Sequence, residues 1–209
     1  MTEYQLSLGS DEQKVSYGLG RQFGDQLAKT QIEQVDLAAV IAGLEQAFLG
    51  QPSVLQSDEM SVAYESIESK LQFAARNIAR RNAADGEALL IRNAKRNGVM
   101  TTESGIQYEI LVKGTGDKPL LSSVVRTHYH GTLVDGTVFD SSTERGEPTE
   151  FAVTGVIAGW TEALLMMPVG SKWRLHIPAK LAYGERGAGT AIPPNSILIF
   201  EIELLEIVS

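Results

Sequence analysis

The spacing of the apolar residues changes near residue 100, and this change constrains the fold more than any other feature. Before residues 101–105 the apolar residues recur every three or four positions, as on one face of a helix. After them they recur at every second position, as on a strand that buries one face: Ile106 and Tyr108 flank the polar Gln107. The 209 residues suffice for one large or two small domains. The expected fold class is therefore α+β, with an all-helical first part followed by an antiparallel sheet.

Two short amphipathic helices are expected first. Residues 10–13 have the spacing of a capping box, and Asp36 is a good N-cap for the second helix. The two apolar faces consist of Val15, Leu19, Phe23 and Leu27, and of Leu37, Val40, Ile41, Leu44 and Phe48. Such short helices cannot bury these faces alone, so residues 1–56 are interpreted as a dimerisation module that pairs with a second copy of the chain. Gly20 and Gly24 favour close approach of another helix, and tolerated surface glycines are the alternative.

A much longer connecting helix is expected over residues 57–98. Ser57 would cap it and no proline follows until Pro119, so it should hold about 40 residues and extend roughly 60 Å. Its seam, of the coiled-coil type, consists of Met60, Tyr64, Ile67, Leu71, Ala74 and Ile78. Beyond Ile78 the arginines and lysines indicate a solvated spacer, with Gly86 as a candidate bend. A nucleic-acid patch is disfavoured, because acidic residues are interleaved and the net charge is −8.

The second part of the chain alternates as strands do. Asp135 and Gly136, between two apolar pairs, predict a hairpin. Residues 172–177 and 198–204 alternate apolar and polar side chains, which places polar residues such as Gln107 and His176 on a wet face of the sheet.

One short apolar helix, at residues 156–164, must cover the other face of that sheet. Pro168 and Gly170 end it. Trp160 cannot face solvent there, and Gly159 beside it would let a backbone approach the indole. Trp160 is therefore expected to form the floor of a core or of a pocket.

The composition excludes several classes of function. The chain has no cysteine, so disulfides, thiol catalysis and cysteine metal sites are ruled out. The net charge argues against nucleic acid or an anionic membrane as the main partner, and no run approaches the 18 apolar residues that span a membrane. The first residues carry neither a basic segment nor an apolar run, which argues against a secretory signal. A cytoplasmic location is the expectation, and a periplasmic protein that has lost its signal is the alternative.

Five segments within residues 105–209 resemble one known family. They are HYHG from His128, GTVFDSS from Gly136, VIAGW from Val156, AYG from Ala182 and IPP from Ile192. In this order and spacing they are similar to the FKBP-type peptidyl-prolyl isomerases. The helical first part resembles the amino-terminal module of the macrophage infectivity potentiator subgroup. The resemblance implies an isomerase domain over residues 105–209, in which the sheet wraps around the short helix, on a chain that forms a homodimer.

The resemblance also implies a shallow aromatic pocket. The residues implied to bind the substrate, or macrolide inhibitors of the rapamycin type, are Tyr129, Phe139, Asp140, Phe151, Val156, Ile157, Trp160, Tyr183, Ile192 and Phe200. Those implied in catalysis are Asp140, Tyr183, Tyr129 and Phe139. The Tyr183 hydroxyl and the Ile157 backbone N–H would hold substrate carbonyls, while Asp140 would act on the twisted amide or orient Tyr129. Ala188 departs from the many members that carry histidine there, which bears on the pocket rim.

Such a site needs neither a metal nor a cofactor. The barrier to rotation about a peptide bond is roughly 18–20 kcal/mol, and a twisted amide is less dipolar than a planar one, so an apolar pocket favours the twisted form. The implied substrates are proline-containing unfolded or partly folded proteins, which the helical module would grip as a chaperone.

Plainer interpretations stand beside these. Phe151, Trp160 and Phe200 could form ordinary core, and residues 140–142 an ordinary turn. His128 and His130 share a strand face as a metal pair would, but with one further histidine and no cysteine we expect them to face solvent. The competing function is a binding protein that kept the pocket without useful catalysis.

Overall fold

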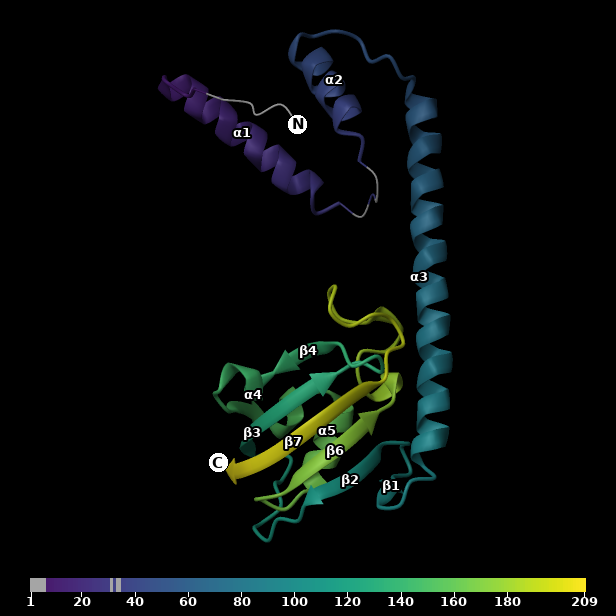
Figure 1. Cartoon of the computed structure of the whole chain (residues 1–209), viewed down its shortest axis with the longest axis vertical. Helices are drawn as coiled ribbons and strands as arrows, with labels where there is room; N and C mark the ends of the chain where they lie inside the picture. Colours follow the sequence, from purple (N-terminus) through teal and green to yellow (C-terminus); the bar gives the residue numbers. More distant parts are fainter. Residues whose placement is uncertain (1–6, 31, 33–34) are drawn as a thin grey trace. The chain divides into compact units, whose positions relative to one another are not determined.

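The computed structural model in Figure 1 describes residues 7–30, 32 and 35–209. The chain divides into two units, Met1–Gln72 and Phe73–Ser209. The first six residues, on which the expected lack of a signal mainly rests, lie outside the described part. No helix among the described residues is both long and apolar enough to cross a bilayer.

The first unit contains α1 (Asp11–Leu27), α2 (Leu37–Phe48) and the start of α3 (Ser57–Asn93). Both predicted caps are confirmed: the Ser10 side chain forms a reciprocal capping box with Gln13, and Asp36 accepts bonds from two backbone N–H groups of α2. Neither α1 nor α2 has a buried residue. The apolar faces are open in the single chain, since Val15 is 63% exposed and Leu37 is 64% exposed. Nothing lies within 4 Å of a side chain added at Gly20 or Gly24, so the close approach expected there stays a prediction about a second chain.

Helix α3 is continuous over 37 residues. Ser57 is its first residue rather than its cap, and it ends at Asn93, after which Gly98 turns the chain with φ of 86°. The bend expected at Gly86 is wrong. Gly86 lies buried within the uninterrupted helix, where Ile197 packs so closely that a Cβ would come within 2.8 Å of its side chain, and this contact explains the glycine.

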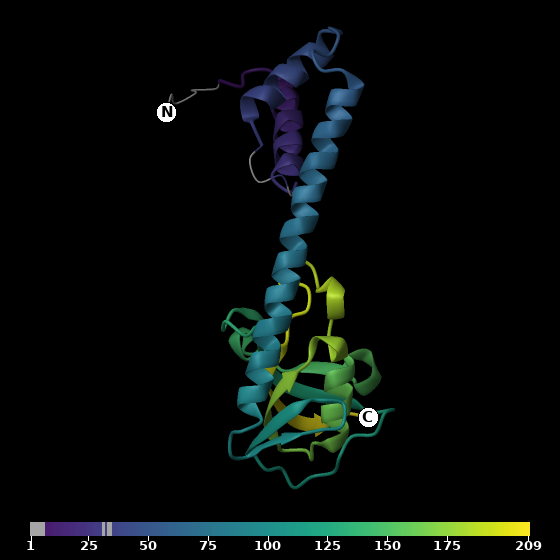
Figure 2. The same cartoon turned by 90° about the vertical axis from the view of Figure 1, so that its right-hand side faces the viewer.

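The solvated spacer predicted beyond Ile78 is also corrected. The arginines and lysines are exposed as expected, but the opposite face of the same turns packs within the second unit (Figure 2). Asn82 donates a hydrogen bond of 2.9 Å to the Pro194 carbonyl, and Asn93 is 3% exposed. The sequence did not predict this contact, because Gly86, Asn82 and Asn93 make it and none of these residues contributes to an apolar helix face.

Seven antiparallel strands form the sheet of the second unit, in the order β1-β2-β6-β7-β3-β4 with β5 also on β3 (Figure 1). The strands are β1 (Val99–Thr101), β2 (Gln107–Val112), β3 (Val124–Thr132), β4 (Val138–Ser141), β5 (Thr149–Ala152), β6 (Lys172–Ile177) and β7 (Leu198–Ile207). The helices are α4 (Ser142–Arg145), α5 (Ala158–Met166) and the 3₁₀ turns η1 (Val153–Gly155), η2 (Ala179–Leu181) and η3 (Gly184–Arg186). The α+β class and the predicted hairpin between β3 and β4 are confirmed.

Helix α5 packs its buried residues into the inner face of the sheet, as predicted. The reason for Gly159 differs from the expected one. A side chain at this position would lie 2.4 Å from the Ile177 side chain of β6, so the glycine lets the helix approach the sheet.

The outer face of the sheet is partly covered, which corrects the prediction for Gln107 and His176. Both are buried, because the end of α3 lies over them. The Asn93 amide donates to Gln107 Oε1 at 2.9 Å and lies 3.2 Å from His176 Nδ1. Gln107 in turn donates to the Leu90 carbonyl at 2.8 Å. This polar cluster fastens α3 to β2 and β6.

Candidate active site

A cavity of about 630 Å³ opens on the inner side of the sheet. All ten residues that the sequence assigned to the pocket line it: Tyr129, Phe139, Asp140, Phe151, Val156, Ile157, Trp160, Tyr183, Ile192 and Phe200. Four further lining residues were not on that list of ten: Gly155, Ala182, Ala188 and Ala191. They are small, and they shape the cavity through backbone and methyl groups; only Ala188 was noted from the sequence, as a residue of the pocket rim. The roles of the ten in catalysis stay predictions.

Trp160 forms the centre of the cavity floor, at 3% exposure. Three aromatic rings meet its indole edge to face: Tyr129 at 5.4 Å, Phe151 at 5.5 Å and Phe200 at 5.2 Å between centroids. These rings come from β3, β5 and β7, whose alternating burial turns them inward. Edge-to-face aromatic pairs add about 0.5–1.5 kcal/mol each beyond their buried area, so the floor is rigid and apolar.

The rim is built by the segment between η2 and β7. Tyr183, 43% exposed, lies at its start. Ala188 and Ile192 exchange two backbone hydrogen bonds of 2.8 and 3.1 Å, which fold the segment into a tight loop. Gly187 is required there, because its φ is 65° and a Cβ would lie 2.2 Å from the Ile192 carbonyl oxygen.

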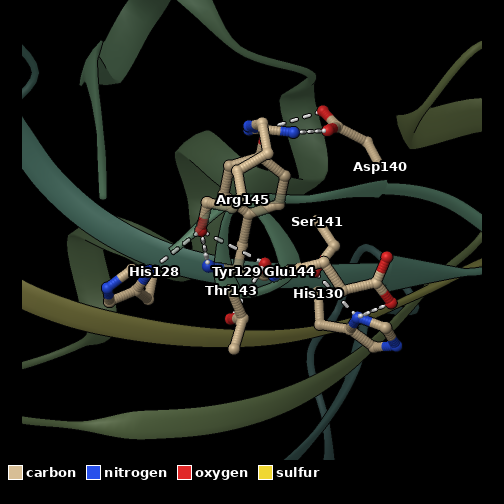
Figure 3. Close-up of polar contacts among 9 residues, drawn as sticks. His128, Tyr129, His130, Asp140, Ser141, Thr143, Glu144 and Arg145 are labelled. Atoms are coloured by element: carbon tan, nitrogen blue, oxygen red, sulfur yellow. Dashed lines mark hydrogen bonds and ion pairs between the residues drawn. The ribbon is translucent and has the colours of Figure 1, made fainter. Parts of the chain in front are cut away.

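A polar triad closes one wall of the cavity (Figure 3). The Tyr129 hydroxyl donates to Asp140 Oδ2 at 2.6 Å. Arg145 donates through Nη1 to Asp140 Oδ1 at 2.5 Å and through Nη2 to the Tyr129 hydroxyl at 2.9 Å. Each of the three side chains therefore fixes the other two.

This triad sets the charge state of the wall. Burial opposes ionisation of Asp140, but the hydrogen bonds from Tyr129 and Arg145 outweigh it and lower the pKa of the carboxyl below its ordinary value. Burial and the bond to Asp140 raise the pKa of the Tyr129 phenol. At neutral pH the wall thus presents a protonated phenol, a carboxylate and a guanidinium.

Arg145 is the site residue that the sequence reasoning missed. It lies at the end of α4, the single turn that follows Asp140 and stops at the left-handed Gly146. The available signal was local: an arginine five residues after an acidic residue, with a serine cap between them and a glycine after it. Its partner Tyr129 is 16 residues away on another strand, and no spacing rule connects the two.

His128 and His130 are half-buried and still in contact with solvent, so the expectation that they face solvent is met in part. His128 Nδ1 lies 3.1 Å from Ser142 Oγ, and His130 Nδ1 lies 3.0 Å from Ser141 Oγ. No cluster of three or more metal-ligating side chains occurs in the described part of the chain.

Comparison with known proteins identifies the family. Residues 116–205 match the profile described as FKBP-type peptidyl-prolyl cis-trans isomerase, and residues 12–110 match the domain amino terminal to it. The chain is 49% identical over 196 residues to the FKBP-type 22 kDa peptidyl-prolyl cis-trans isomerase of Escherichia coli (strain K12), covering 94% of this chain and 95% of that protein. It is 39% identical over 206 residues to the outer membrane protein MIP of Legionella longbeachae, covering 96% and 88%.

The fold agrees with this assignment. The crystal structure of FkpA from Escherichia coli matches with a TM-score of 0.69 at 36% identity, covering 96% of this chain and 98% of that one. Both parts of the expected resemblance, the carboxy-terminal isomerase domain and the amino-terminal module, are confirmed. The chain therefore belongs to the FKBP-type peptidyl-prolyl cis-trans isomerases that carry an amino-terminal helical domain.

Proposed function

We propose that this chain accelerates rotation about X-Pro bonds in unfolded and partly folded proteins by non-covalent stabilisation of the twisted amide. The observation that carries the proposal is an apolar aromatic cavity with one charged wall. In such a cavity the planar, dipolar amide loses more hydration than the twisted one, so the barrier falls. A 10⁴-fold acceleration requires only about 5.4 kcal/mol.

The polar groups have separate tasks in this proposal. The proline ring packs on Trp160. The Tyr183 hydroxyl and the Ile157 backbone N–H donate to substrate carbonyls, and the latter has no partner within its helix because it belongs to the N-cap of α5. Asp140, held by Tyr129 and Arg145, supplies a fixed negative charge beside the rotating amide. Phe139, packed edge to face on Phe200 at 5.3 Å, adds its ring to the cavity lining next to that charge.

A matched pair of carboxylate variants tests this mechanism in the full chain. Asp140→Asn keeps an acceptor for Tyr129 but removes the charge. The kcat/KM on a short proline-containing peptide should therefore fall about tenfold, which corresponds to about 1.4 kcal/mol less stabilisation of the transition state. Asp135→Asn alters a carboxylate on the same hairpin that does not line the cavity, and it should leave the rate unchanged. Equal rates for both variants would contradict the electrostatic role of Asp140.

A binding protein without useful catalysis is the competing function. It would bind a proline-containing peptide or a rapamycin-type macrolide in the same cavity without accelerating proline-limited refolding. The refolding rate of a substrate protein, measured with and without the chain, distinguishes the two.

We further propose that residues 1–56 and the seam up to Ile78 hold a homodimer and grip unfolded clients. The open apolar faces of α1 and α2 support this, because two faces of this size need a partner. A client held by these helices meets the pocket at raised effective concentration. Full chain and a fragment from Phe73 should therefore act alike on a short peptide, and the full chain should be much faster on a refolding protein. An equal loss on both substrates would contradict this division.

The expected cytoplasmic location finds no support among the relatives, one of which is described as an outer membrane protein. It stays a prediction, with the periplasm as the alternative. Fractionation of cells that express the full-length protein measures the compartment directly.

A further inference from the structure

The turn that carries Arg145 cannot hold its own position. Helix α4 has four residues, from Ser142 to Arg145, and one turn of helix has no stability in isolation. Its place therefore depends on the contacts at its two ends. At the far end, Arg145 bonds Asp140 and Tyr129. At the near end, the anchors are the hydroxyl groups of Ser141 and Ser142.

Both serine hydroxyls are buried and both work at the start of the turn. Ser141 caps it by accepting the Glu144 backbone N–H at 3.1 Å. Ser142, with no exposed surface, accepts the Tyr129 backbone N–H at 2.7 Å and so ties the turn to β3. Each hydroxyl has a single hydrogen to donate, and each has one imidazole nitrogen within 3.1 Å.

The two faces of β3 thus reach the same turn. Tyr129 points into the cavity and meets Arg145, while His128 and His130 point to the outer side and meet the serines (Figure 3). The register explains this, because His130 pairs with Ser141, whereas Asp140 pairs with Gly131 on the inner side.

We propose that His128 and His130 are positioning residues for catalysis, which hold the α4 turn through Ser142 and Ser141 and thereby fix Arg145 on the Tyr129–Asp140 pair. The proposal rests on the catalytic role proposed above for that pair. Loss of an imidazole removes one of the partners that hold each serine hydroxyl in place, as a donor or as an acceptor depending on the tautomer. The Ser142 hydroxyl then keeps the Tyr129 carbonyl at 3.3 Å as its acceptor. With one partner fewer, the serine hydroxyl is held less firmly in its rotamer, and the turn that it anchors is positioned less firmly.

The chain offers matched variants for the test. His128→Ala and His130→Ala remove the ring. His128→Asn and His130→Asn should restore the hydrogen bond to the serine, since the asparagine amide places a donor or an acceptor near the position of Nδ1. Arg126→Gln is the control, because Arg126 lies on the same outer face of β3 and pairs with Glu150 and Glu206, away from the turn.

We expect each alanine variant of the full chain to lower kcat on a short proline-containing peptide about threefold to tenfold. KM should change little, because the cavity floor is untouched. The asparagine variants should recover most of the rate, and Arg126→Gln should match the wild type. In an Arg145→Met background, neither histidine variant should lower the rate further.

The double variants and the asparagine variants test whether the histidines act through the α4 turn. If the histidine losses and the Arg145→Met loss multiply, or if asparagine does not rescue, the histidines do not act through the turn and the proposal is overturned. If Arg145→Met alone leaves the rate unchanged, the proposed catalytic wall fails, and the positioning role fails with it. Tryptophan fluorescence during urea unfolding reports whether an alanine variant is folded. If it is not, the asparagine variant and its double with Arg145→Met carry the test.

Discussion

Acid should loosen the contact between α3 and the sheet through one buried histidine. His176 is 5% exposed, and burial together with the nearby charges of Arg96 and Arg174 lowers its pKa from 6.5 to about 4, against a smaller opposing effect of Glu109. Its Nδ1 faces the Asn93 amide, whose nitrogen also donates to Gln107. His176 Nδ1 must therefore accept a hydrogen bond from Asn93. Protonation of Nδ1 would place its N–H against the N–H of the Asn93 amide, so that two donors face each other.

The sign and size follow from linkage. The pKa in the folded state lies below its unfolded value, so the contribution of His176 to stability is complete above pH 6.5 and is lost as the pH falls toward 4. A pKa that falls from 6.5 to about 4 corresponds to roughly 3 kcal/mol in total. Between pH 7.5 and pH 5.0 the wild type should lose roughly 2 kcal/mol through this group.

The variant His176→Asn keeps an acceptor for Asn93 and removes the titrating group. Its absolute stability should fall, because the smaller side chain leaves a gap, but the loss of roughly 2 kcal/mol between pH 7.5 and 5.0 should disappear. Urea unfolding of the full chain, followed by tryptophan fluorescence, measures this, since Trp160 and Trp173 both lie in the second unit. Between pH 7.5 and 8.5 the two proteins should respond alike. The same acid loss in both proteins would refute the reasoning.

Three further predictions concern the proposed function. Light scattering should find a dimer for the full chain at micromolar concentration and a monomer for a fragment that starts at Phe73; a monomeric full chain would rule out the assembly. Tyr183→Phe should slow the peptide reaction several-fold without weakening the dimer, because it removes one hydroxyl at the rim. In the variant Trp173→Phe, Trp160 is the remaining tryptophan, and a rapamycin-type macrolide should change its fluorescence. No change at high micromolar ligand would count against the pocket as the macrolide site.

The sequence predicted those parts of the fold that depend on local chemistry. The two helix caps, the β3–β4 hairpin and the end of α5 follow from residues within four positions of one another. The inward direction of Tyr129 follows from alternation along β3. The placement of the ten pocket residues around one cavity needed the family resemblance, because periodicity alone does not distinguish a pocket from a core.

The parts that could not be predicted are polar contacts between distant segments. Asn93, Gln107 and His176 each look solvated in their own segment, and only their meeting makes them buried. Arg145 looks like a surface arginine until the turn brings it onto Tyr129. Periodicity distinguishes residues by apolar character alone, so polar groups of this kind are expected in solvent until the fold brings them together.

The contact of α3 with the sheet also determines where the two halves of the chain can be separated. A cut near Thr101, where the change of period suggests the boundary, removes Asn93 and Leu90 and exposes Gln107 and His176 to water. Each hydrogen bond lost in this way costs about 0.5–1.5 kcal/mol, and the packing of α3 on the sheet is lost with it, which together is a large part of the stability of a small domain. A fragment from Thr101 would therefore lose activity on every substrate through instability, and this loss could not be distinguished from a catalytic role of the helices.

A fragment from Phe73 keeps Gly86 against Ile197 and Asn93 in its cluster. Unfolding of the two fragments in urea should thus differ by several kcal/mol in favour of the longer one, and equal stability would show that the end of α3 rests on the sheet without holding it.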